Sequence, residues 1–281
     1  MSYSAEISRR NPGLFIFLLD QSRSMSHKLG GSARSKAQEA SEAINRQIYE
    51  IIYRCTKTDG VRDYFDIGVI GYGLKPDTAQ SLLGDSAIVP ISKLAENPLR
   101  MVKRTEKIKD PDGNEVESEF EFPVWFDPVA NSNTPMVSAF KLASDWLDDW
   151  ISEHPSSYPP IVINISDGAA TDGDPTEQAN RMRSLSTRDG NVLLWNCHLS
   201  ELKGADPVIF PDSEDKLPSG DKFAKQLFDM SSTLPEAFIG IAQERGLTVS
   251  SGSRGYVFNA GLDELLQLLD IGTRAPVDNI Q

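Results

Sequence analysis

The stretch that decides the fold is LFIFLLDQSRS, residues 14–24. Its first part, Leu14–Leu19, is an unbroken apolar run, which is typical of a strand buried on both faces of a parallel sheet. The run ends on a carboxylate, Asp20, and serines stand at the next alternate positions, Ser22 and Ser24. A buried strand that ends this way is followed either by a capped turn or by a functional site, and the remaining sequence has to distinguish the two.

The segments that follow alternate between strand-like and helix-like patterns. Apolar residues at spacings of three and four predict amphipathic helices over Ala37–Cys55 and Met136–Trp150. Apolar runs predict further strands at Phe65–Tyr72, Ile161–Ser166, Val192–Cys197 and Gly255–Phe258, and other signals predict helices after Asp174, near Phe223–Met230 and over Leu262–Ile271. This order predicts an α/β fold, a doubly wound, mostly parallel, Rossmann-like sheet flanked by helices.

The length of 281 residues fits a single domain, 1–281, with an insertion. The insertion is residues 74–133, where the alternation of strands and helices stops. Within it, MVKRTEKIK–DPDG–NEVESEFEF predicts a β-hairpin with lysines opposite glutamates. This hairpin is interpreted either as a solvated, charge-paired ribbon or as an appendage for a specific partner. Residues 273–281 are expected to form a flexible tail.

Charge and composition narrow the class of protein. The net charge of −13 repels phosphate backbones, so nucleic acid is not an expected partner. No apolar run approaches the length of a membrane span, and the first residues lack the apolar core of a signal peptide. The two cysteines, Cys55 and Cys197, are far apart and do not suggest a disulfide framework. Together these features predict a cytoplasmic protein that does not contact a membrane.

Polar side chains gather where predicted strands end and helices begin. Asp20 and Asp167 each follow a buried strand, and ligands of open parallel sheets bind at the carboxyl ends of the strands. Ser22 and Ser24 follow Asp20 directly, and Thr134 precedes Pro135, in the position of a helix N-cap. Each feature alone is usually structural, but together they offer five hard oxygen donors. Such donors suit Mg²⁺, with Mn²⁺ or Ca²⁺ as alternatives.

The order of these residues, Asp20-Gln-Ser22-Arg-Ser24, then Thr134, then Asp167, resembles the metal-ion-dependent adhesion site of the von Willebrand factor A (VWA) family. The resemblance covers the central sheet and its helices. It implies that Ser22, Ser24 and Thr134 hold the metal and that Asp20 and Asp167 act partly through water. It also implies that an acidic side chain, Glu or Asp, of a partner protein completes the coordination.

The sequence departs from the family at Arg23, where many members have glycine. Arg23 and Asp172 are candidates for contacts just outside the metal ligands. Residues 223–236 resemble bacterial members encoded beside kinases and phosphatases in stress or tellurite-resistance loci. The resemblance therefore implies a bacterial, cytoplasmic VWA protein.

Several functions stay open at this point. The first is a Mg²⁺-dependent protein–protein interaction module, a regulator or scaffold whose partner is a kinase, a phosphatase or an AAA+ ATPase. The second is a metal-dependent hydrolase or phosphatase. Against it, the sequence has neither a P-loop pattern nor a Gly-x-Ser-x-Gly elbow, so no enzyme activity is expected. The third is a purely structural domain with a vestigial site.

Overall fold

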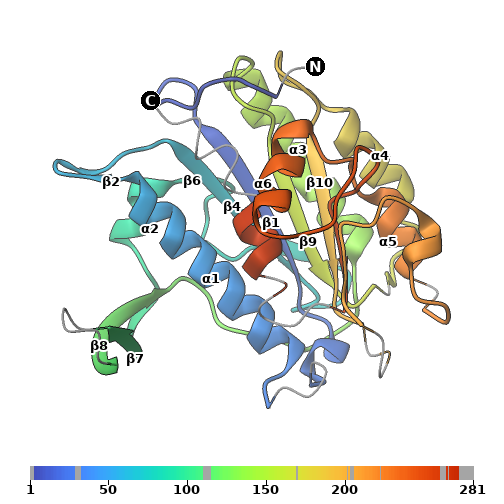
Figure 1. Ribbon diagram of the computed structural model, residues 1–281, viewed down its shortest axis with the longest axis horizontal. Helices are drawn as coiled ribbons and strands as arrows, with labels where there is room; N and C mark the ends of the chain where they lie inside the picture. The colour runs from blue at the N-terminus through green and yellow to red at the C-terminus, as the bar shows by residue number, and fades with distance from the viewer. Residues whose placement is uncertain are drawn as a thin grey trace.

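The computed structural model of the chain describes residues 3–28, 33–109, 115–168, 170–200, 202, 206–221, 223–259, 264 and 266–271, with the backbone alone at 106–109. The chain folds around a mostly parallel sheet with helices on both faces (Figure 1). Five strands run parallel: β1 (Gly13–Asp20), β4 (Phe65–Tyr72), β9 (Ile161–Ser166), β10 (Leu193–His198) and β12 (Tyr256–Phe258). Antiparallel strands extend it: β5 (Ala79–Ser81), β6 (Val89–Pro90) and β11 (Val208–Ile209).

The strand order confirms the predicted doubly wound arrangement. Along the sheet the strands lie in the order β11-β12-β10-β9-β1-β4-β5. The chain moves from β1 to β4 on one side, and then crosses back to β9 on the other side of β1. The strand order therefore reverses between β1 and β9, and ligands of doubly wound sheets bind outside such a reversal.

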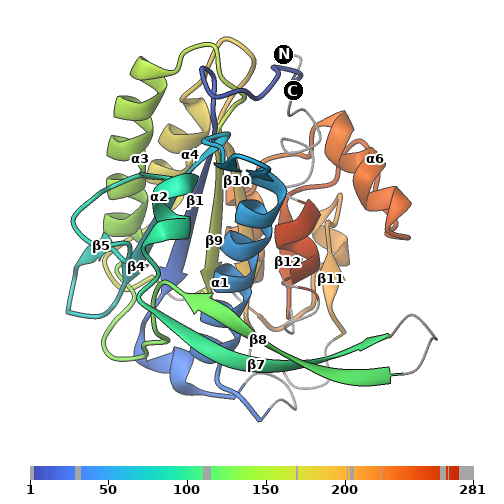
Figure 2. The same ribbon diagram turned by 90° about the vertical axis from the view of Figure 1, so that its left-hand side faces the viewer.

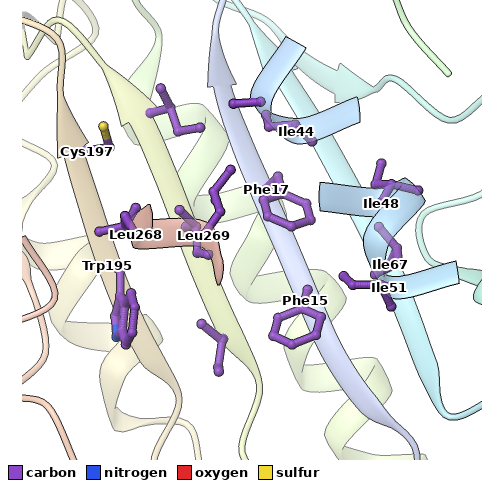
Figure 3. Packing of buried hydrophobic residues seen from close by; sticks show 14 of the residues in the cluster. Phe15, Phe17, Ile44, Ile48, Ile51, Ile67, Trp195, Cys197, Leu268 and Leu269 are labelled. Atoms are coloured by element: carbon purple, nitrogen blue, oxygen red, sulfur yellow. The ribbon is translucent and has the colours of Figure 1, made fainter. Parts of the chain in front are cut away.

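The alternation of side chains along β1 creates two cores. Phe15, Phe17 and Leu19 belong to one buried cluster, and Leu14, Ile16 and Leu18 belong to the other, because successive residues of a strand point to opposite faces. Figure 3 shows the first cluster, in which isoleucines of helix α1 (Lys36–Cys55) pack on β1 and β4. Because both faces of β1 are buried against apolar clusters, all its positions from Leu14 to Leu19 are apolar in the sequence.

The helices divide between the two faces of the sheet. Helix α1 lies on one side, and α3 and α4 lie on the other (Figure 2). Besides α1, the described α-helices are α2 (Ile91–Glu96), α3 (Met136–Glu153), α4 (Thr176–Ser184), α5 (Ala224–Met230) and α6 (Glu236–Glu244). Two short 3-10 helices are η1 (Arg23–Ser26) and η2 (Glu214–Lys216). Residues 266–271 are also helical. No helix of the described residues is long and apolar enough to span a membrane.

Helix α1 begins at a capping box that the sequence encodes locally. The Ser35 hydroxyl accepts the backbone N–H of Gln38, and the Gln38 side chain accepts the backbone N–H of Ser35. These two bonds satisfy groups that a helix start otherwise leaves without partners. They fix where the helix begins and therefore which residue, Lys36, occupies its first position.

Between β4 and α3 the chain departs from the alternation. A long ribbon of β7 (Arg100–Lys109) and β8 (Glu115–Val124) extends away from the sheet (Figure 2). Its register places Lys103 opposite Glu121, Lys107 opposite Glu117 and Lys109 opposite Glu115. The predicted turn at 110–113 lies outside the described residues, as does the predicted tail at 273–281. A smaller pair, β2 (Thr56–Lys57) and β3 (Gly60–Val61), follows α1.

One arginine ties the ribbon to α1. The Arg104 guanidinium donates to both carboxylate oxygens of Glu42, at 2.6 and 2.9 Å, and lies 3.4 Å from the ring centroid of Phe122. A two-stranded ribbon is marginally stable alone, so this contact is expected to hold its base in place.

We expect Arg104→Met to speed hydrogen exchange at backbone amides 118–122 and to lower the free energy of unfolding by about 1–2 kcal/mol. Arg100→Met is the matched control, because Arg100, at the start of the same strand, forms a solvent-exposed ion pair with Asp127. Equal exchange rates in the two variants would contradict an anchoring role for Arg104.

Candidate functional site

The candidate site begins where the strand order reverses. β1 and β9 are neighbours, with Leu19 beside Ile165, so Asp20 and Ser166 stand next to each other at the carboxyl edge. The Ser166 hydroxyl donates to Asp20 Oδ2 at 2.7 Å and accepts the backbone N–H of Gly168 at 3.0 Å. One serine therefore connects the two loops that carry Asp20 and Asp167.

The serine loop turns its hydroxyls together. The backbone N–H of Ser22 donates to Asp20 Oδ1 at 2.8 Å, which folds the chain back over the end of β1. The hydroxyls of Ser22 and Ser24 lie 3.0 Å apart, with Ser22 buried and Ser24 half-buried. The alternate spacing of the two serines thus produces a pair of adjacent oxygen atoms beside a buried carboxylate.

Thr134 reaches this edge through the end of the insertion. Ser132 forms a bridge with Ser22, and its carbonyl accepts the backbone N–H of Arg23 at 2.8 Å. The backbone N–H of Thr134 donates to the hydroxyl of Thr171, in the loop that follows Asp167. Thr134 is therefore held between the serine loop and the loop of the second aspartate.

The predicted N-cap role of Thr134 is wrong. Helix α3 begins at Met136, and the Asp172 carboxylate accepts the backbone N–H groups of Val137 and Ser138 at 3.0 and 2.8 Å. A carboxylate at a helix N-terminus also interacts favourably with the helix dipole. The Asp172 carboxylate therefore caps the N-terminus of α3. Arg23 lies at the surface with an exposed side chain.

Burial dominates the electrostatics of Asp20. The side chain is fully buried, and desolvation together with the nearby charge of Asp167 raises the pKa of the Asp20 carboxyl to about 6. Bonds from Ser22 and Ser166 oppose this shift but do not cancel it. Two carboxylates buried close together favour any cation that can lie between or beside them.

The structure adds neighbours that the sequence did not single out. The Lys36 ammonium lies 3.5 Å from Asp167 Oδ2, and the side chain of Lys36 is fully buried. His198 Nε2 lies 3.0 Å from the backbone carbonyl of Asp167 and must donate to it, because a carbonyl only accepts. Burial lowers the pKa of His198, which favours its neutral form. Hydropathy patterns could not reveal these contacts, which depend on the tertiary fold.

A divalent cation fits the residues present. Asp167 Oδ1 is buried and has no hydrogen-bond partner within the part of the chain that the structure describes, and the Asp167 side chain is only 8% exposed. An orphaned carboxylate oxygen of this kind calls for a ligand, because leaving it unsatisfied is costly. The other donors are two serine hydroxyls, a threonine hydroxyl and Asp20, a set of hard oxygens that suits Mg²⁺ or Mn²⁺.

The site is not a conventional cluster of strong ligands. Among the described residues, no group of three or more His, Cys, Asp or Glu side chains is placed to hold a metal ion. The candidate set instead combines two carboxylates with three hydroxyls. Any cation it binds must therefore draw further oxygens from water or from a bound molecule.

Comparison with known proteins gives a fold but no family. No family model matches the chain, and no curated protein matches it. The pilus adhesin SpaC from Lactobacillus rhamnosus GG is similar in structure, with a TM-score of 0.53 and 10% identity over 98% of this chain and 32% of SpaC. At that identity the likeness shows a shared α/β fold alone.

Two other solved structures are less similar. The minor pilin PilB from Streptococcus sanguinis has a TM-score of 0.43 and 9% identity over 95% of this chain and 62% of PilB. The vWF domain of the pili tip protein Mfa5 from Porphyromonas gingivalis has a TM-score of 0.34 and 16% identity over 59% of this chain and 40% of that structure. The chain spans less than two thirds of each of the three.

These comparisons correct the family and functional predictions. The assignment to a bacterial cytoplasmic VWA protein is wrong, because no family model matches and the similar structure with the TM-score of 0.53, SpaC, is a pilus adhesin. The predicted role as a cytoplasmic, stress-related regulator or scaffold is wrong for the same reason, and so is the cytoplasmic location. The prediction of a metal-ion-dependent adhesion site is wrong together with the family, and no group of three or more His, Cys, Asp or Glu side chains in the described residues supports it. The five residues and their chemistry stand as predictions of their own.

Proposed function

We propose that the chain is an adhesive domain of a surface protein and that it binds an anionic ligand through a divalent cation. The ligands of the cation are Asp20, Ser22, Ser24, Thr134 and Asp167. The observation that carries the proposal is the buried Asp167 Oδ1, which lacks a hydrogen-bond partner among the described residues at the sheet edge where the serine hydroxyls converge. The fold likeness to a pilus adhesin supports the adhesive class of the role.

The chemistry of the donors defines the ligand class. Mg²⁺ takes six oxygens in octahedral geometry, and it usually keeps water or a ligand oxygen beside the protein groups. With only two carboxylates among its protein ligands, the site leaves room for a third negatively charged oxygen. A Glu or Asp side chain on a target protein supplies such an oxygen. The proposal assigns binding without turnover, so catalysis is not expected.

We expect calorimetric titration of Mg²⁺ into chelator-treated protein to show one saturable site that Ser24→Ala weakens about tenfold or more, because a metal ligand is lost. Thr134→Val, which keeps the shape but removes the hydroxyl, has the same expected effect. Ser26→Ala is the matched control, since the Ser26 hydroxyl lies in the same turn but bonds to the carbonyl of Arg23.

Ligand binding is tested with beads that carry a glutamate-containing peptide. We expect the protein to be retained in Mg²⁺ and released by chelator, and not to be retained by the matched glutamine peptide. Unchanged Mg²⁺ binding in Ser24→Ala and Thr134→Val, or retention that survives the chelator, would overturn the proposal.

A further inference from the structure

Lys36 is buried beside the candidate site, in a position that is energetically unfavourable for a positive charge. Lys36 occupies the first position of α1, where the helix dipole is positive and a cation is disfavoured. Its side chain has no exposed surface, so its ammonium has also lost its hydration. Both effects oppose a lysine at this position.

The carboxylates of the site offset these costs. The Lys36 ammonium pairs with Asp167 Oδ2 at 3.5 Å. The Asp167 carboxylate in turn repels the negative charge of the Asp20 carboxylate. Helix packing does not explain the choice of residue, because an apolar side chain of similar length would fill the space without the cost of desolvation. The charge of Lys36 therefore has its role at the site and not in the core.

We propose that Lys36 is an internal counter-charge, which weakens Mg²⁺ binding to the ligand-free site and strengthens the attraction of the Mg²⁺-loaded site for a carboxylate ligand. This inference rests on the proposed function and adds the coupling between its two binding steps. The charges of Asp20, Asp167 and Lys36 leave one net negative charge, so bound Mg²⁺ makes the site positive. Without Lys36, the Mg²⁺-loaded site would be neutral, and its electrostatic attraction for an incoming carboxylate would be weaker.

The expected behaviour is positive coupling between cation and ligand. In a buried site, one unit charge within a few ångströms changes binding by about tenfold or more. Mg²⁺ should therefore bind weakly alone and more tightly once a carboxylate is present. The same coupling must act in reverse, so Mg²⁺ increases the affinity for the carboxylate by an equal factor.

The test compares Mg²⁺ titrations of wild type, Lys36→Met and Lys28→Met, each with and without a fixed high concentration of acetate as the carboxylate probe. Lys28 is the matched control, because it is an exposed lysine that precedes the same helix. We expect Lys36→Met to bind Mg²⁺ alone about tenfold more tightly than wild type. Acetate should raise the Mg²⁺ affinity of wild type and of Lys28→Met, and raise that of Lys36→Met much less.

The outcomes separate this inference from the proposed function. If wild type binds Mg²⁺ and Lys36→Met binds it equally, with the same response to acetate, the inference is overturned and the proposed function stands. If neither protein binds Mg²⁺ in either condition, both are overturned. Binding by Lys36→Met alone would support the counter-charge role, because it would show that the lysine suppresses an otherwise competent site.

A merely structural role for Lys36 has a different signature. It predicts that Lys36→Met lowers the melting temperature equally in chelator and in Mg²⁺. A counter-charge predicts a lower melting temperature in chelator, where the carboxylates lose a cation, and a larger rise on adding Mg²⁺. The variant is purified in Mg²⁺, and Lys36→Gln, which keeps a polar side chain without the charge, repeats the measurement if Lys36→Met does not fold.

Discussion

Asp20→Asn is expected to abolish Mg²⁺-dependent stabilisation while making the chelator-treated protein more stable at neutral pH. The wild-type carboxylate is fully buried beside Asp167, and its pKa is raised from 3.8 to about 6 by that burial and by the charge of Asp167. Holding it ionised at neutral pH therefore costs about 3 kcal/mol. Asparagine removes this cost and still offers an oxygen to the backbone N–H of Ser22.

The pH dependence gives the sign of the effect. Because the folded-state pKa lies above the unfolded value, wild type gains stability as the pH falls through about 6 toward 4, where the carboxyl becomes protonated. Asparagine has no such transition. In chelator, the stability advantage of Asp20→Asn should thus be largest at neutral pH and should shrink toward pH 4.

Thermal unfolding in chelator and in Mg²⁺, repeated between pH 4 and pH 7, measures both effects. Asp85→Asn is the matched control, since Asp85 is exposed. A Mg²⁺-induced rise in melting temperature that persists in Asp20→Asn would show that the cation binds elsewhere. If the stability advantage of Asp20→Asn over wild type in chelator does not change with pH, then keeping the buried Asp20 carboxylate ionised does not destabilise the fold.

Gly73→Ala is expected to destabilise the fold by about 3 kcal/mol or more and to weaken Mg²⁺ binding as well. Gly73 follows β4 with a φ of 103°, and an added Cβ would lie 2.4 Å from the carbonyl oxygen of Asn133 and 2.9 Å from the backbone nitrogen of Ser22. The clash involves backbone on both sides, so no side chain can move away to relieve it. Both the serine loop and the segment that carries Thr134 would shift.

Gly84→Ala separates the clash from the backbone strain. Gly84 also has a positive φ, 87°, but an added Cβ there would meet no atom of the described residues within 4 Å. We expect it to cost about 1 kcal/mol, in line with the conformational strain alone, and to leave Mg²⁺ binding unchanged. Denaturant unfolding measures the free energies, and calorimetry measures the binding. Equal losses in the two variants would mean that the close approach at Gly73 does not matter.

Much of the fold could be predicted because its signals are local. Strands β1 and β9 are buried on both faces and therefore read as apolar runs, and α1 carries a strong apolar stripe together with its own capping box. Helix α6 gave no comparable signal, because it has nine residues and no side-chain cap. The edge strands β5, β6 and β11 have two or three half-buried residues each, too few to show a period.

The candidate site was predictable only in its outline. Asp20 and Asp167 could be placed at one edge because parallel strands end together, and the serine spacing indicated a shared direction for the two hydroxyls. The partners of these residues come from distant segments. Asp172 starts α3 from another loop, and Lys36 meets Asp167 across the sheet edge. No periodicity in the sequence marks contacts of this kind.

The β7–β8 ribbon has a consequence for solubility at high concentration. Within the described residues it is a sheet of two strands, so each strand has one edge without a neighbour, and such edges add strands from other molecules. Exposed glutamates stand at alternate positions along β8, at 115, 117, 119 and 121. Two copies brought face to face along β8 would oppose like charges at every second residue. The acidic row thus protects an extended, projecting element against self-association, and because salt screens exposed charges, that protection weakens as the salt concentration rises.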